Sequence, residues 1–355
     1  MTPSVNLHIL AKRFTQLSKS AYFDPAFREF ARRTVDVTLH VLDNPGAYPD
    51  EIVRAFERHL WRVMQFVQGS RAKDAPHETQ YALRKALSHW ISNDSVLISS
   101  AALEGFGFFL APEDIWEFVA ASINGYDTKG YKPLVVRIGS PEAFKHRPLY
   151  CIPLFHELGH FVDEQLKITE LSLIMHPITQ TPAGIDAEAW KFLNRRHRME
   201  HFADLFGAVY CGVATNESLL AIAPNNPDSY THPSTAKRVS LVNDFLSGKS
   251  NPMVDVLQSA CLARTGKALA PRFALPDLPA SFDRVLTHRV TSDEELFGVF
   301  QVAWHYLKEQ LEKRAAPWVD GNSTVPEIEG TVNDLTEKSI RNYEIRERWD
   351  SGSAN

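Results

Sequence analysis

Two histidines and a glutamate form the pattern whose spacing carries the clearest chemistry. Residues 155–160 have the sequence FHELGH, which contains the pattern HExxH. Residues four apart on a helix lie on one face, so His156 and His160 can bind one metal ion while Glu157 contacts a water on that ion. The alternative is two histidines on a helix face beside a solvated glutamate. The segment from Ile152 to Lys167 has a proline near its start and apolar residues at helical spacing, so we expect a helix there.

A zinc ion that activates water needs a third protein ligand and one position left for the water. The continuation HExxHxxGxxH is excluded, because Asp163 and Leu166 stand where the glycine and the third histidine should be. The best remaining donor is Glu200, on a second helix expected from Asp186 to Gly212. Asp204 lies one turn further on the same face, and we expect it to accept a hydrogen bond from a ligand histidine.

Other residues compete for roles at this site. The alternative third ligands are Asp163, Asp186 and Glu188. His197 lies one turn before Glu200 on nearly the same face and is a candidate for lining the cleft. His201 points about 100° away round the helix, so we expect it to pack or to face solvent.

The order of motifs resembles that of the gluzincin metallopeptidases, which carry HExxH on one helix and ExxxD or ExxAD on a later one. Residues 200–204, EHFAD, match the second motif. Residues 232–239, HPSTAKRV, match the HPxxxxR(I/V) stretch of the CAAX prenyl endopeptidases, so the chain looks most similar to soluble relatives of that family. The ImmA/IrrE metallopeptidases, which carry HELGH and a similar second motif, are the second choice. The resemblance covers about residues 150 to 245.

The resemblance implies a role for each residue that matches a motif. It implies Zn²⁺ held by His156, His160 and Glu200, with Glu157 as general base and Asp204 supporting a ligand. In gluzincins a later histidine or tyrosine donates to the oxyanion, and Tyr230 and His232 both stand in that region. The alternative is that residues 231–233 only shape the start of the next helix. Arg238 is expected to pair with an acidic group at the site, the alternative being an exposed cation.

The remaining chain predicts mostly helices and one strand. Helices are expected at residues 5–20, 27–42, 51–67, 78–90, 112–123, 234–247, 251–265 and 293–314. Residues 133–139, PLVVRIG, form the strand candidate, and its leading proline favours a sheet edge, where Leu134 to Ile138 would pair with an extended substrate. We therefore expect an α+β, predominantly helical protein: a zincin-like core with a small sheet and flanking helical regions.

The expected organisation has three parts. A helical N-terminal region covers residues 1–125, a zincin-like metallopeptidase core covers 126–250, and a helical C-terminal region with a flexible tail covers 251–355. The flanking regions are where we expect control, through a regulatory partner or through autoinhibition, for example by Thr331 to Trp349 lying over the cleft.

Composition limits the location and the partners of the chain. With 38 Lys and Arg against 43 Asp and Glu, the net charge is −5, which gives no basic surface for nucleic acid. The most apolar stretch, Val96 to Ala111, falls short of the about 18 uninterrupted apolar residues of a membrane span, and the N-terminus lacks the pattern of a signal peptide. Cys151, Cys211 and Cys261 are widely spaced and favour a reducing compartment, so we expect a cytoplasmic protein.

These observations together predict a zinc-dependent endopeptidase. It would hydrolyse peptide bonds in a protein or peptide substrate with a metal-activated water, and Glu157 would be the general base. Two alternatives stay open: a non-proteolytic regulatory or scaffold protein that keeps a metallopeptidase-like fold, and a metal hydrolase whose substrate is not a peptide.

Overall fold

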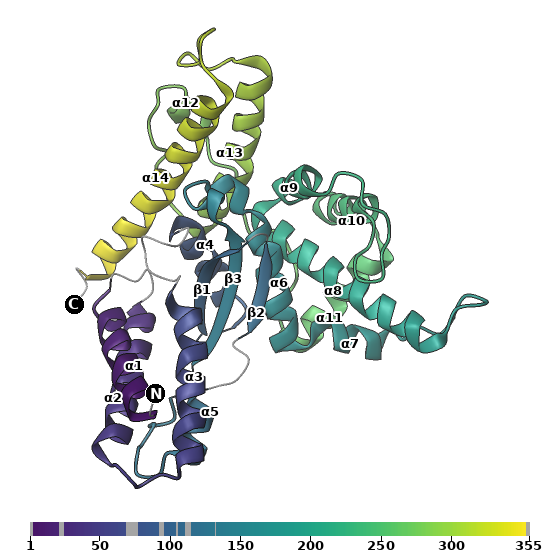
Figure 1. The fold of residues 1–355 in the computed structure, drawn as a ribbon. Helices are drawn as coiled ribbons and strands as arrows, with labels where there is room; N and C mark the ends of the chain where they lie inside the picture. The colour runs from purple at the N-terminus through teal and green to yellow at the C-terminus, as the bar shows by residue number, and fades with distance from the viewer. Residues whose placement is uncertain are drawn as a thin grey trace. The chain divides into compact units, whose positions relative to one another are not determined.

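The computed structural model describes residues 3–20, 25–68, 77–91, 96–103, 106–110, 115–131 and 133–352 (Figure 1). The chain is predominantly helical and divides into two compact units. Unit 1 comprises Met1–Gln80 and Ser92–Glu142, and unit 2 comprises Tyr81–Ile91 and Ala143–Asn355. The expected three-part division therefore differs from the observed one. Residues after 250 belong to the same unit as the HExxH helix, because helices from this region pack on the helices that carry the motifs.

Unit 1 contains a group of helices that surround an apolar core. The helices are α1 (Pro3–Ser18), α2 (Pro25–Asp43), α3 (Asp50–Gln68) and α5 (Ile115–Ser122). Phe14, Phe30, Phe56 and Trp116 are fully buried between them. The apolar spacing in the sequence predicted these helices to within a few residues, since one face of each must be buried.

Unit 1 also contains a three-stranded sheet. Strands β1 (Val96–Leu103), β2 (Gly107–Leu110) and β3 (Leu134–Pro141) lie in the order β1-β3-β2, with β1 parallel and β2 antiparallel to β3. The strand predicted at residues 133–139 is present, but its placement at a sheet edge is wrong. Pro133 precedes the strand, so its missing N–H does not interrupt the ladder.

The central position of β3 also contradicts the predicted substrate pairing. Val136 is paired with Ile98 on one side and with Leu110 on the other. At residues 136–139 both sides of β3 are paired, which leaves no free edge there for a peptide backbone. From its sequence, Val96 to Ala111 was interpreted only as an apolar stretch too short to span a membrane, and neither β1 nor β2 was predicted.

Unit 2 carries all three motifs and is helical. Its elements are the end of α4 (His77–Ser88), the short η2 (Pro148–Cys151), α6 (Pro153–Leu166), α7 (Ile168–Met175), α8 (Ala187–Cys211), α9 (Ala214–Ile222), α10 (Thr235–Ser247), α11 (Pro252–Thr265), α12 (Pro279–Phe282), α13 (Asp293–Lys313) and α14 (Val325–Gly352). The part of this unit that the structure describes has no strand. The expected α+β, zincin-like core with a small sheet is therefore wrong for the unit that holds the motifs, because the sheet belongs to unit 1.

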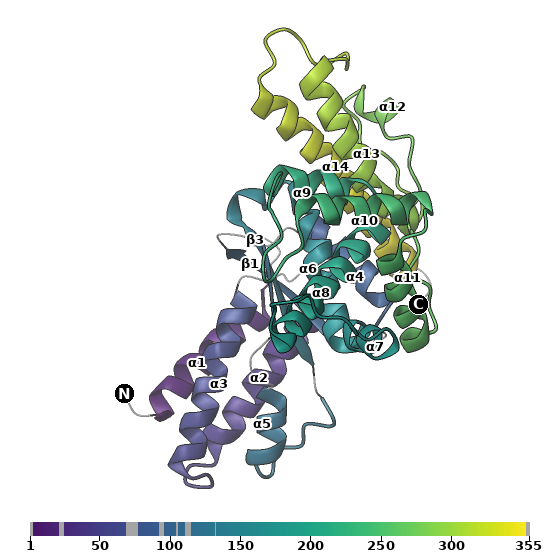
Figure 2. The same ribbon diagram turned by 90° about the vertical axis from the view of Figure 1, so that its right-hand side faces the viewer.

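Helices α6 and α8 form the closest packing in unit 2, and Figure 2 shows them side by side. A Cβ added at Gly159 would lie 2.9 Å from both Ala203 Cα and Phe206 Cβ. Only a glycine fits this approach without displacing backbone. The predicted close approach of the two helices is therefore present, and Gly159 on α6 allows it.

Local signals fix the ends of the helices that carry the motifs. The side chain of Asp186 accepts a hydrogen bond from Ala189 N and begins α8. Ser234 caps α10 in the same way, and Gly248 ends α10 at a φ of +68°, as the sequence predicted. Lys167 ends α6 in the left-handed conformation and α7 begins directly after it. This sharp turn was not predicted.

The C-terminal helix is longer than expected. Residues 331–349 lie within α14, which packs on α13 and whose Asn333 side chain accepts a hydrogen bond from Leu149 N at 3.2 Å. Among the helices in the described ranges, none is both long and apolar enough to cross a membrane.

Candidate metal centre

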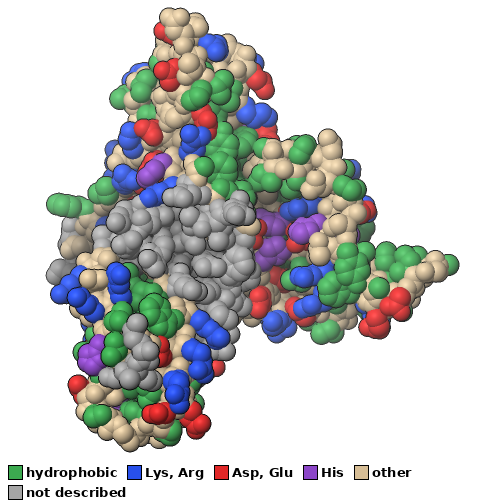
Figure 3. Space-filling view, in the orientation of Figure 1, with side chains coloured by type: hydrophobic (Ala, Val, Ile, Leu, Met, Phe, Trp, Pro, Cys, Tyr) green, Lys and Arg blue, Asp and Glu red, His purple; other side chains and the backbone are tan. Residues whose placement is uncertain are grey.

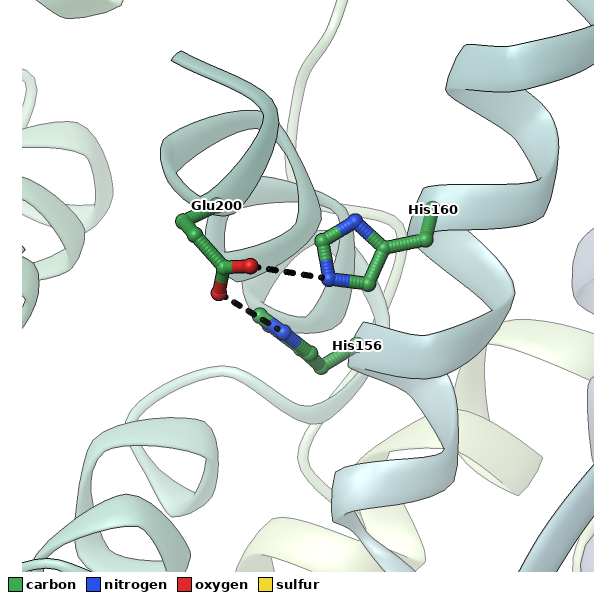
Figure 4. A group of neighbouring side chains, drawn as sticks. All are labelled: His156, His160 and Glu200. Atoms are coloured by element: carbon green, nitrogen blue, oxygen red, sulfur yellow. Dashed lines mark ion pairs between the residues drawn. The ribbon is translucent and has the colours of Figure 1, made fainter. Parts of the chain in front are cut away.

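His156, His160 and Glu200 come together between α6 and α8. Nε2 of His156 lies 3.4 Å from Oε2 of Glu200, and Nε2 of His160 lies 3.4 Å from Oε1. One ligand atom from each residue can be chosen so that all three lie within 4.8 Å of one another. Figure 4 shows both imidazoles pointing from one helix toward the glutamate of the other. The HExxH spacing and the glutamate from the second motif thus converge as the sequence predicted.

The donor set and its spacing fit a metal ion. Zinc binds histidine nitrogen and carboxylate oxygen at about 2.0–2.2 Å, so two ligands of a tetrahedral ion lie about 3.3–3.6 Å apart. Each histidine nitrogen lies at such a distance from one oxygen of Glu200, His156 from Oε2 and His160 from Oε1. Oε2 of Glu200 is also buried and makes no well-formed hydrogen bond among the described residues, its contacts being the longer ion pairs with His156 at 3.4 Å and Arg238 at 3.8 Å. A bound cation would satisfy this oxygen.

Asp204 and Arg238 support the outer side of the His156 ring. Nδ1 of His156 lies 3.0 Å from Oδ1 of Asp204. The Arg238 guanidinium donates two hydrogen bonds to the same carboxylate, from Nε at 2.8 Å and from a terminal nitrogen at 2.6 Å. Asp204 is thus held from α10 and orients a ring on α6. These are the contacts expected of Asp204 and Arg238 from their motifs.

The carboxylates change the pKa values of the two histidines in opposite directions. Burial disfavours the charged form of His156, but the nearby carboxylates of Asp204 and Glu200 outweigh burial and raise its pKa to about 10. For His160, burial and the nearby positive charge of His156 lower the pKa to about 4. Burial acts against ionisation of Glu200, yet the two imidazoles hold its pKa at about 2. Without a metal, these values make His156 the charged imidazole near neutral pH, with His160 neutral and Glu200 ionised.

Glu157 lies on the first turns of α6, next to His156, His160 and Glu200, which together are called the metal group below. Its carboxyl is partly buried, and burial raises its pKa above the ordinary value. The charges that act on it come from His156, Glu200 and Arg238, which places it within the electrostatic reach of the metal group. A carboxyl whose pKa is raised toward neutrality suits a general base.

The structure separates the two candidates for the oxyanion donor. Nε2 of His232 lies 3.5 Å from Oε1 of Glu200, so the structure brings His232 to the metal group. Tyr230 instead stacks on Phe192, with ring centroids 5.1 Å apart, and is about half exposed. The loop before α10 thus points a histidine at the group and a tyrosine along the outside of α8.

The two other histidines of α8 do not reach the metal group in the same way. Nε2 of His197 contacts the carbonyl oxygen of Ser229 at 2.9 Å and so ties the loop to the helix. His201 is buried, and burial lowers its pKa to about 4. The expectation that His201 packs against the protein agrees with this position.

The competing carboxylates have other partners. Asp163 accepts hydrogen bonds from the backbone N–H of Thr169 at 2.7 Å and from its hydroxyl at 2.6 Å, which fixes the start of α7. Asp186 is the cap of α8, and exposed Glu188 pairs with Lys191. Glu200 is therefore the carboxylate that faces the two histidines.

The group is open to solvent on one side. The side chains of His156 and His160 are 14% and 16% exposed, and that of His232 is 56% exposed. Figure 3 shows histidines at the surface beside acidic and basic side chains, in the part of the view that Figure 1 labels α6 and α8. A molecule in solution can therefore reach the group.

Two residues near His232 were not singled out from the sequence. The Thr231 hydroxyl lies 2.8 Å from Nδ1 of His232, and the Ser229 hydroxyl accepts from His232 N at 2.9 Å. The hydroxyl residues directly before the HP pair are the sequence signal that could have drawn attention to them.

The chain was compared with models of protein families, with curated proteins and with solved structures, and none of them matches it.

Proposed function

We propose that this chain is a zinc-dependent endopeptidase of the gluzincin type. The observation that carries the proposal is the placement of two imidazole nitrogens at 3.4 Å from the two oxygens of Glu200, the spacing of ligands round a tetrahedral ion. Glu157 lies on the same helix as the two histidines, α6, and supplies a general base, which a purely structural metal site does not need. Two histidines and one carboxylate favour zinc over magnesium or calcium, which prefer oxygen ligands.

The residues divide the work of hydrolysis. A Zn²⁺ ion at this site would polarise the scissile carbonyl and lower the pKa of a water molecule. Glu157 takes a proton as the water oxygen bonds to the carbonyl carbon, and delivers it to the amine nitrogen when the C–N bond breaks. His232 supports the step by donating a hydrogen bond from Nε2 to the oxygen that becomes negative. Asp204 keeps the His156 ring oriented through both states.

The proposal also includes the compartment, the substrate and the control of the protein. Cys151, Cys211 and Cys261 are all buried and none of them is in a disulfide among the described residues, which suits a reducing compartment such as the cytoplasm. The substrate is a protein or a peptide. Control by a partner or by the flanking helices is retained as a prediction, to be tested by removing residues after Pro317.

The proposal is tested by comparing Glu157→Gln with the wild-type chain. Both are analysed for metal by mass spectrometry and for cleavage of a denatured protein mixture. We expect one zinc per chain in both, and a fall of about 10²- to 10⁴-fold in cleavage rate for the variant, the usual contribution of a general base. Glu164→Gln is the matched control, because Glu164 lies on the same helix and is exposed.

Three outcomes would contradict the proposal. Absence of zinc from the wild-type chain excludes the metal site. Equal cleavage by the wild type and Glu157→Gln excludes the assigned base. Zinc without cleavage by the wild type favours the regulatory or scaffold alternative, and hydrolysis of a non-peptide ester or amide in its place favours the third.

A further inference from the structure

We propose that the Thr231 hydroxyl fixes the tautomer of His232, so that the ring presents an N–H at Nε2 toward the metal group. Thr231 is then a positioning residue that acts through His232. The use made of this N–H in catalysis rests on the proposed function, whereas the tautomer itself is a property of the chain that can be measured without substrate.

The proposal starts from the two sides of the His232 ring. Nδ1 lies 2.8 Å from Oγ1 of Thr231, an ordinary hydrogen-bond length, and Nε2 lies 3.5 Å from Oε1 of Glu200, an electrostatic contact. A neutral imidazole carries a proton on one nitrogen and a lone pair on the other. The Glu200 carboxylate can only accept, so the favourable arrangement puts the proton on Nε2. Nδ1 then accepts from Thr231.

The hydrogen bonds within the loop leave the Thr231 proton available for this task. The Ser229 hydroxyl accepts from the backbone N–H of His232 at 2.9 Å and donates its own proton to the His232 carbonyl at 3.2 Å. Ser229 therefore has no proton left for Thr231, whose oxygen lies further away at 3.4 Å. The shorter contact of Thr231 is the one with the imidazole.

His197 holds this loop on α8. A carbonyl oxygen can only accept, so Nε2 of His197 donates to Ser229 O at 2.9 Å. From the other side, Asp228 accepts from Ser234 N at 2.7 Å and pairs with Lys237 at 2.5 Å, which ties the loop to α10. The loop is thus anchored to two helices on either side of the Thr231–His232 contact, and the ring direction is set locally by Thr231.

The tautomer decides what His232 can do. With the proton on Nε2, the ring donates toward an oxygen that becomes negative beside Glu200. With the proton on Nδ1, the ring would direct a lone pair at the same oxygen and at the Glu200 carboxylate, and both contacts would be repulsive. A hydroxyl on Nδ1 therefore selects the catalytically useful form of a half-exposed histidine.

The test is nitrogen NMR of the histidine side chains in the full chain, metal-free and loaded with Zn²⁺, at about pH 8.5, where an ordinary imidazole is neutral. His232→Gln assigns the signals. We expect one tautomer in the wild type, with the proton on Nε2, and a mixture in Thr231→Val, which keeps the shape and removes the hydroxyl. Thr231→Ser should restore the single tautomer. Thr287→Val, whose hydroxyl contacts Asn342, is the matched control and should change nothing.

Kinetics provide the second readout. Thr231→Val should lower kcat by about 3- to 10-fold, the size of one net hydrogen bond, with KM unchanged and with zinc content as in the wild type. A proton on Nδ1 in the wild type, or an unchanged tautomer in Thr231→Val, would overturn the proposal. If the chain holds no zinc or cleaves nothing, the proposed function fails while the tautomer measurement still decides this inference.

Discussion

Unit 2 contains two clusters of charged side chains, and they satisfy their polar atoms in different ways. The first, the metal cluster, consists of His156, His160, Glu200, Asp204 and Arg238. The second, the Lys85 cluster, consists of Tyr81, Lys85, Asp293, Tyr343 and Glu347. Each combines carboxylates with a cation, so a sequence pattern of charges alone would not distinguish them.

In the Lys85 cluster the protein supplies the partners. Lys85 Nζ lies 3.1 Å from Asp293 and 2.7 Å from Glu347, and so bridges the two carboxylates. The Tyr343 hydroxyl donates to Asp293 at 2.8 Å, and the Tyr81 hydroxyl donates to the second oxygen of Glu347. Such a cluster fixes α4, α13 and α14 to one another.

In the metal cluster the protein supplies a full set of hydrogen bonds to the Asp204 carboxylate but not to the Glu200 carboxylate. Asp204 has both oxygens hydrogen-bonded by Arg238, whereas buried Oε2 of Glu200 has, among the residues described, only the longer ion pairs with His156 at 3.4 Å and Arg238 at 3.8 Å. Burying a carboxylate oxygen without a well-formed hydrogen bond is costly, and a bound cation would satisfy it. The difference between the clusters teaches that an incomplete set of partners, more than the presence of charge, distinguishes a group of side chains that could hold a metal ion.

The largest expected effect comes from removing the cation of each cluster. Arg238→Met should lower the free energy of unfolding of the metal-free chain by about 3 kcal/mol, because it removes two hydrogen bonds from the buried Asp204 carboxylate and leaves it with the His156 contact at 3.0 Å. Lys85→Met should cost about 1 kcal/mol or less, because its partners are about one third exposed and keep their tyrosines. Urea unfolding measures both. Equal losses would show that the two clusters do not differ in this way.

The second effect is on zinc binding. Glu200→Gln should weaken zinc binding on the order of 10²- to 10³-fold, because a zinc site of three or four ligands gains about 3–4 kcal/mol from each. Glu347→Gln removes the same charge from the Lys85 cluster and should leave the affinity unchanged. Competition with a chromogenic chelator gives both values. Comparable weakening by the two variants would mean that overall charge, and not the donor set, holds the ion.

The site was more predictable from the sequence than the fold. Local signals suffice for α6 and α8: helical spacing, the Asp186 cap and the four-residue separations of His156 from His160 and of Glu200 from Asp204. Because side chains four apart share a face, two such helices packed at Gly159 bring the ligands together. The partner of Asp204, Arg238, came from the resemblance, and its two hydrogen bonds could not be read from spacing.

The sheet was less predictable because its pairing is not local. β3 pairs with β1 through contacts between residues 38 apart, such as Val96 with Leu134, and the apolar run from Val96 shows no alternation that would distinguish a strand from a buried helix. The central position of β3 depends on two strands that were not predicted. For the same reason, the assignment of the sheet to the unit that carries the HExxH motif was wrong, since sequence order placed β3 next to α6 while packing placed it with residues 1–80.

The smallest effect, taken per pH unit, concerns the proton that His156 must lose when the metal cluster binds zinc. In the metal-free chain the pKa of His156 is raised to about 10, that of His160 is lowered to about 4 and that of Glu200 to about 2, so near neutral pH only His156 must lose a proton to become a ligand. Zinc binding should therefore release one proton, and affinity should rise about tenfold per pH unit from neutrality to about pH 10. Since the pKa of His156 is raised on folding, the same proton stabilises the metal-free fold fully below the ordinary pKa of 6.5 and ceases to do so as the pH passes about 10.

Calorimetry in two buffers of different protonation enthalpy counts the proton that is released when zinc binds, and the control Glu347→Gln should release it equally. A heat of binding that does not depend on the buffer would mean that His156 is already neutral in the metal-free chain. The charges of Asp204 and Arg238 would then cancel each other and would not keep the His156 ring protonated.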